Sequence, residues 1–102
     1  MSNPALRNNQ DKHRYELIDD DQVLGYAEYN MMGDAVMFTH TEIASEHEGK
    51  GYGSQLAQKA LDDVRSQHKQ VMPVCQFITA YIRRHPDYID LVTPDSRRAF
   101  KI

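Results

Sequence analysis

The chain has 102 residues, a length typical of a single domain with a modest hydrophobic core. Its apolar content of 40%, charged content of 26% and formal net charge of −3 describe a globular protein and argue against one that coats nucleic acid or an anionic membrane. Its single cysteine, Cys75, allows no intrachain disulfide, and the sequence shows no signal peptide or apolar membrane span, so we expect a cytoplasmic protein.

The first half of the chain predicts strands. Residues 1–12 are polar and are expected to be disordered. Two short runs rich in Tyr, Leu, Ile and Val follow, at 13–18 and 23–30, and the acidic stretch between them is typical of a hairpin connection. A third run, 35–43, is rich in β-branched and aromatic residues. These runs predict an antiparallel meander of three strands.

The second half predicts helices around one short strand. Between 53 and 68 the apolar residues recur on one face of an amphipathic helix. A brief strand is predicted at 71–74 and a second helix at 76–84. We therefore expect a single α+β domain over 13–93, followed by a frayed tail at 94–102.

The segment between the third strand and the first helix is rich in glycine, with the sequence Glu48-Gly49-Lys50-Gly51-Tyr52-Gly53-Ser54. Glycines let the backbone approach a ligand closely, and the start of a helix offers unpaired N–H groups and a positive dipole end. The segment fits neither the P-loop nor the dinucleotide-binding pattern. It predicts a phosphate or pyrophosphate cradle, with a glycine-rich turn that binds nothing as the alternative.

This loop resembles the coenzyme A loop of the GCN5-related N-acetyltransferases, whose pattern is Gln/Arg-x-x-Gly-x-Gly/Ala, except that Glu48 replaces Gln or Arg. The chain also resembles a very small YjdJ-type subgroup of acetyltransferase-like proteins. The likeness to that subgroup covers roughly 15–92 and includes His40-Thr41-Glu42-Ile43, Pro73-Val74-Cys75-Gln76-Phe77 and Tyr81-Ile82-Arg83-Arg84-His85-Pro86.

The resemblance implies a minimal acyl-coenzyme A N-acyltransferase fold, in which a fourth strand splays away from the third. The pantetheine arm of acetyl-coenzyme A would lie along Thr39 to Ile43, its pyrophosphate on the amides of the loop, and its thioester near Cys75. The residues that would contact the coenzyme are Ile43, Glu48, Gly49, Lys50, Gly51, Tyr52, Gly53, Ser54 and Cys75.

Four residues are candidates for the acyl-transfer chemistry, which needs a base for the amine proton and an acid for the departing thiolate. His40 and Glu42 alternate along one strand and therefore share a face. Cys75 lies where a strand gives way to a helix, which favours the thiolate. Tyr81 resembles in position the tyrosine that protonates the leaving thiolate in the larger family. Each also has a structural interpretation, as a hydrogen-bonded or packed side chain.

The sequence thus favours an enzyme that transfers an acyl group, expected to be acetyl, from coenzyme A to a small amine or a protein amine. The alternative is a protein that binds acetyl-coenzyme A or coenzyme A without turnover, as a sensor or accessory subunit. We expect a monomer or weak homodimer. No metal is expected, because the histidines lack the spacing of metal ligands.

Overall fold

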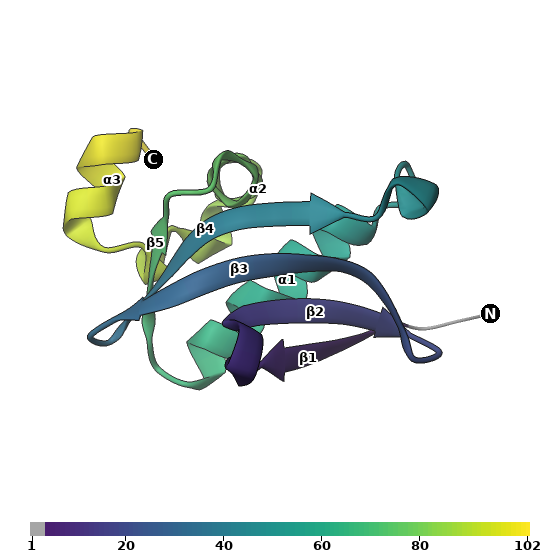
Figure 1. Cartoon of the computed structure of the whole chain (residues 1–102). Coiled ribbons are helices and arrows are strands. Elements are labelled where there is room, and N and C mark those ends of the chain that lie inside the picture. The colour runs from purple at the N-terminus through teal and green to yellow at the C-terminus, as the bar shows by residue number, and fades with distance from the viewer. Residues whose placement is uncertain (1–3) are drawn as a thin grey trace.

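A computed structural model describes residues 4–102. Five strands form one sheet in the order β1-β2-β3-β4-β5 (Figure 1), and their bounds are β1 Ala5–Asn9, β2 Arg14–Asp19, β3 Gln22–Met32, β4 Ala35–Ile43 and β5 Gln70–Pro73. The first four strands pair antiparallel as a meander, and β5 pairs parallel with β4. The predicted α+β class and the meander are confirmed, with one more strand than expected.

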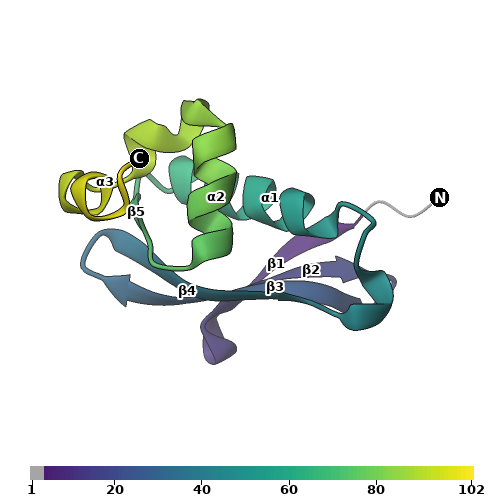
Figure 2. The same ribbon diagram turned by 90° about the horizontal axis from the view of Figure 1, so that it is seen from above.

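The helices all lie on one face of this sheet, which Figure 2 shows from the side. They are α1 (Tyr52–Ser66), α2 (Gln76–Arg84) and α3 (Pro94–Phe100), and short 3-10 turns occur at η1 (Gln10–Lys12), η2 (Ser45–His47) and η3 (Pro86–Leu91). Within 4–102, none of the helices is long and apolar enough to cross a membrane. Among residues 4–102 no α-helix covers the opposite face of the sheet, the open face.

The core lies between the sheet and the helices. The apolar stripe of α1 is fully buried there, against inward side chains of the strands such as Leu17 and Phe38. Burial of this stripe stabilises the fold, because each fully buried large aliphatic side chain contributes about 1.5–3 kcal/mol relative to exposure. The apolar periodicity predicted this helix to within two residues at each end.

The prediction that residues 1–12 are disordered is wrong where the structure describes them, because β1 occupies Ala5–Asn9; residues 1–3 lie outside the described part. Side chains that look solvated in the sequence hold this strand. Arg7 and Asn9 both donate hydrogen bonds to the carboxylate of Glu16 on β2, with N–O distances of 2.8 and 3.3 Å. The strand therefore forms through polar cross-strand pairs that a hydrophobic pattern does not reveal.

The prediction of a frayed tail at 94–102 is also wrong, because α3 forms over Pro94–Phe100. Thr93 caps this helix by accepting a hydrogen bond from the Ser96 N–H at 3.3 Å, and Pro94 occupies its first turn, where no N–H is needed. Arg83 on α2 donates to the carbonyl of Phe100. Capping and this contact with α2 stabilise a segment whose composition is polar.

The strands β4 and β5 pair over a short distance and then separate. Their ladder runs from Ala35↔Gln70 to Phe38↔Pro73, and the Cys75 N–H then donates to the Phe38 carbonyl at 2.8 Å. Beyond this point the chain turns into α2, while β4 continues to Ile43 without a strand partner on that side among the described residues. This is the splayed arrangement that the resemblance implied.

Candidate functional site

A pocket of about 390 Å³ opens beside the glycine-rich loop, where β4, α1 and α2 approach one another. Its lining comes from the last residues of β4, the loop, the first turn of α1 and the first turn of α2, and consists of Thr41, Ile43, His47, Glu48, Gly49, Gly51, Tyr52, Gly53, Ser54 and Phe77. The structure therefore brings together most of the residues predicted to contact a coenzyme. Lys50 is exposed and is not part of the lining.

Two glycines give the loop its shape. Gly49 and Gly51 have φ values of +81° and +79°, in the left-handed region that side-chain-bearing residues rarely adopt. Gly51 is also the N-cap of α1, and no side chain caps the helix there. These two positions turn the chain sharply from the end of β4 into the helix, so the backbone itself forms one wall of the pocket.

The first turn of α1 presents free backbone donors to this pocket. The N–H of Gln55 bonds the Gly51 carbonyl at 3.2 Å. The preceding N–H groups, those of Tyr52, Gly53 and Ser54, therefore lie before the first intrahelical bond. The first turn contains no acidic side chain, so the positive end of the helix dipole is not neutralised from within the helix. This arrangement favours the binding of a ligand with an anionic oxygen.

The third glycine serves packing between two helices. A Cβ placed on Gly53 would lie 2.7 Å from the Phe77 ring, well inside van der Waals contact. Gly53 therefore allows the start of α1 to lie directly against α2, with Phe77 as the apolar wall between them. Apolar periodicity does not mark Phe77 as part of the site, because its role depends on how two helices cross.

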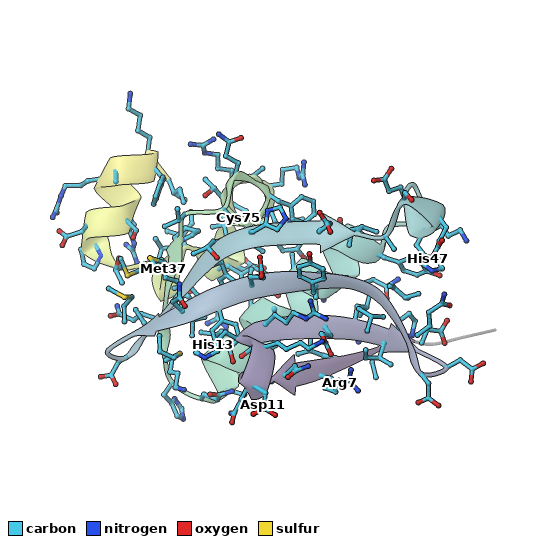
Figure 3. All side chains as sticks on the ribbon, in the orientation of Figure 1. Arg7, Asp11, His13, Met37, His47 and Cys75 are labelled. Carbon is cyan, nitrogen blue, oxygen red and sulfur yellow. The ribbon has the colours of Figure 1, made fainter. Side chains whose placement is uncertain are left out.

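The thiol of Cys75 lies at the point where β4 and β5 separate, as Figure 3 shows. The residue is buried and forms the N-cap of α2, and its Sγ is 3.3 Å from Oγ1 of Thr41. Thr41 in turn lines the pocket. The thiol is thus adjacent to the pocket through Thr41, which lies in the stretch Thr39 to Ile43 that the resemblance assigned to the pantetheine arm.

His40 and Glu42 lie on the open face, opposite the pocket. A bulge at Thr39 in β4 shifts the register, so that Glu28 pairs with His40 while the next residue, Tyr29, pairs with Phe38. Phe38 is buried in the core, whereas the side chains of His40 and Glu42 are 54% and 57% exposed. The two residues share a face as expected, but it is not the face that carries the glycine-rich loop.

A polar group surrounds Glu42 on the open face. The Tyr26 hydroxyl donates to Oε2 of Glu42 at 3.0 Å, and Nε2 of His40 is 3.6 Å from Oε1 of the same carboxylate. The hydrogen bond to Glu42, followed by burial, raises the pKa of Tyr26. Arg14 stacks over the Tyr26 ring, with its guanidinium carbon 4.3 Å from the ring centroid. The open face thus holds a carboxylate and an imidazole close to each other.

Tyr81 lies outside the pocket lining. Its ring is buried and stacks on His85 with ring centroids 4.1 Å apart. Burial, with a smaller effect of the Asp62 carboxylate, raises the pKa of Tyr81. Its neighbours are thus those of a packed aromatic residue between α1, α2 and η3. Among residues 4–102, no group of three or more His, Cys, Asp or Glu side chains could hold a metal ion.

Comparison with known proteins identifies the family. The sequence model of the GCN5-related N-acetyl-transferase family matches residues 14–91. The chain belongs to this family. Its fold is similar to the NMR solution structure of a GCN5-like protein from Staphylococcus aureus, with a TM-score of 0.67, 19% sequence identity and 91% of each chain covered. No curated protein matches the chain. The GCN5-related resemblance seen in the sequence is thus confirmed.

Proposed function

We propose that this protein binds an acyl-coenzyme A, most simply acetyl-coenzyme A, in the pocket beside the glycine-rich loop, and transfers the acyl group to an amine. The observation that carries the proposal is the row of free N–H groups at the start of α1, next to two positive-φ glycines. Such a backbone suits a pyrophosphate, because it offers several donors and the positive end of a helix dipole without requiring a cationic side chain.

The residues that would hold the coenzyme follow from this position. The amides of Gly49 to Ser54 would bind the pyrophosphate, and Thr41 and Ile43 would contact the pantetheine arm along β4. When bound, the coenzyme supplies an acyl thioester, whose carbonyl carbon is activated toward attack by an amine. Cys75 lies beside Thr41 and is positioned to contact this end of the arm. Its thiol can also donate a proton to a departing thiolate.

The acceptor would approach from the open face. Beyond Phe38, β4 has no β5 partner, so the strand edge from Thr39 to Ile43 separates the pocket from the open face without a ladder of hydrogen bonds. An amine on the open face would meet Glu42 and His40, whose Oε1 and Nε2 atoms lie 3.6 Å apart. Either side chain could take up the proton that the amine loses when its nitrogen bonds to the carbonyl carbon of the thioester.

One observation favours a second function, binding without turnover. Of the four candidate catalytic residues, only Cys75 adjoins the pocket, while His40 and Glu42 lie on the opposite face and Tyr81 is packed elsewhere. A protein that holds acyl-coenzyme A as a sensor, or that relies on a partner for the acceptor site, would need only the pocket.

Calorimetry with acetyl-coenzyme A and coenzyme A, followed by a thiol-release assay with a panel of amines, tests both functions. We expect binding to both ligands, and release of free thiol only when an amine is present. Binding without thiol release over the whole panel would leave the second function. Absence of binding to either ligand would contradict both.

A further inference from the structure

His47 is a histidine of the pocket whose side chain makes no hydrogen bond within residues 4–102. It ends the η2 turn between β4 and the glycine-rich loop, and Figure 3 labels it beside the end of β4. Its side chain is only 14% exposed and packs edge-on against the Tyr52 ring, with ring centroids 6.0 Å apart. The imidazole is therefore fixed in the wall of the pocket rather than free in solvent.

Both ring nitrogens of His47 are buried and have no hydrogen-bond partner within residues 4–102. The nearest carboxylate oxygen, Oε1 of Glu46, lies 3.7 Å from Nε2, which is longer than a hydrogen bond. An imidazole always carries at least one N–H, so an unused donor is buried here. Buried donors without partners are rare in native proteins and point to a missing acceptor.

The composition of the pocket indicates what that acceptor is. No Lys or Arg lines the pocket, and His47 is the one lining side chain that can carry a positive charge. Glu48, the next residue, contributes a carboxylate that repels an anion. A ligand held by the amides of the loop must present oxygens that accept hydrogen bonds, and a phosphoryl oxygen beside Glu48 needs a donor that offsets the carboxylate.

We propose that His47 donates a hydrogen bond to a phosphoryl oxygen of the coenzyme's pyrophosphate and, with the loop amides, determines affinity for the nucleotide part of the ligand. This inference rests on the proposed function and assigns a residue that the glycine motif alone does not include. His47 acts here as a binding residue that counters Glu48. It takes no part in proton transfer on the open face.

The test compares His47→Phe with His47→Gln by calorimetry against coenzyme A, dephospho-coenzyme A and pantetheine. Phe keeps the aromatic contact with Tyr52 but removes both nitrogens, so affinity for coenzyme A and dephospho-coenzyme A should fall about tenfold, as for the loss of one hydrogen bond to a charged group. Affinity for pantetheine, which lacks phosphates, should not change. Gln retains a donor and should recover most of the loss.

His85→Phe is the matched control, because His85 also stacks on a tyrosine but lies outside the pocket. It should leave all three affinities unchanged. Thermal unfolding of the unliganded His47→Phe protein separates binding from structure: its melting temperature should equal or exceed that of the wild type, since the change removes buried donors without partners. A lower melting temperature together with weaker binding of all three ligands would show a structural role instead.

The remaining outcomes separate this proposal from the function on which it rests. If wild type does not bind coenzyme A, the proposed function fails and this inference fails with it. If wild type and His47→Phe bind coenzyme A equally, the inference alone is wrong. If His47→Phe loses affinity for coenzyme A but not for dephospho-coenzyme A, the partner of His47 is the 3′-phosphate and the pyrophosphate assignment is overturned.

Discussion

The two faces of β4 carry different side chains, although both are formed by the same stretch, Thr39 to Ile43. On the face toward the helices, Thr41 and Ile43 line a pocket together with the backbone of the glycine-rich loop, and the Cys75 thiol lies against Thr41. On the open face, His40 and Glu42 are exposed and hydrogen-bonded or paired with polar neighbours. We propose that the first face binds an anionic ligand with an extended arm and that the second face takes up the proton of the amine.

Under the proposed function, β4 would separate the site that binds the coenzyme from the residues that take up the amine proton. Because β5 leaves the sheet at Pro73, the edge of β4 lies open between the two faces. Variants on one face should therefore alter affinity for coenzyme A, and variants on the other should alter turnover.

The largest effect is expected for Glu42→Gln on the open face. Loss of the proposed general base should lower kcat by about 100-fold or more, while the Kd for coenzyme A should stay at the wild-type value. Tyr26→Phe, which removes only the hydroxyl that holds Glu42, should act in the same direction but more weakly. Steady-state kinetics measures kcat, and calorimetry measures the Kd for coenzyme A. A weaker Kd in Glu42→Gln would break the division between faces.

The next effect is expected for Gly51→Val on the pocket side. A β-branched residue at φ +79° introduces about 1–3 kcal/mol of backbone strain. The loop relieves this strain by adopting another conformation. Affinity for coenzyme A should therefore fall about 10- to 100-fold. Gly33→Val provides the control, because Gly33 has φ +64° in the turn between β3 and β4. It should lower stability but not affinity. Equal affinity loss in both variants would argue against a cradle at Gly51.

A smaller effect is expected on the free energy of unfolding, through the pH-dependent charge of Glu16 on the open face. Glu16 is 1% exposed; burial alone would raise its pKa, but hydrogen bonds from Arg7, Arg14 and Asn9 outweigh burial and lower it below the ordinary value of 4.5. The carboxylate therefore stabilises the fold above about pH 4.5, and this contribution is lost as the pH falls through the folded-state pKa.

We expect Glu16→Gln to lower the free energy of unfolding by about 1–2 kcal/mol at pH 7, with a difference from wild type that shrinks toward pH 3. Urea unfolding at pH 7, 4 and 3 measures it. Coenzyme A affinity at pH 7 should not change, because Glu16 lies on the open face. A difference that stays constant with pH would show that the arginine contacts do not set the pKa of Glu16.

The smallest effect is expected for Glu48→Gln. Removing an exposed negative charge beside the proposed pyrophosphate should raise affinity for coenzyme A about two- to fivefold, and this gain should shrink as salt screens the charge. Glu46→Gln is the control, since Glu46 is exposed nearby but does not line the pocket. Calorimetry at low and at high salt measures the affinity for coenzyme A under each condition. Weaker binding by Glu48→Gln would mean that the carboxylate holds the loop rather than opposing the ligand.

Much of the fold could be predicted from the sequence, because apolar periodicity reports burial. The meander, the strand β5 and the helices α1 and α2 were predicted this way. The strand β1 and the helix α3 were not, because polar contacts hold them: Glu16 binds Arg7 across two strands, and Thr93 caps α3. Such contacts depend on partners that a single segment does not reveal.

The candidate site could be predicted only in part, for a related reason. Glycine spacing locates the loop, since positive φ values are a local property of the chain. The side chains of His40 and Glu42 lie on the open face of the sheet because of the bulge at Thr39. Strict alternation along β4 would place them on the same face as Phe38. His47 and Phe77 enter the pocket through packing between elements, and neither has a local signal.

The order of the elements along the chain also has a consequence for synthesis. All three helices follow the four-stranded meander, so the apolar face that contains Leu17 and Phe38 has no cover until Tyr52–Ser66 has left the ribosome. Stalled chains that end before Tyr52 should bind a hydrophobic dye, and chains that extend well past Ser66 should not. We therefore expect an aggregation-prone stage during synthesis, which ends when α1 forms and covers the apolar face of the sheet.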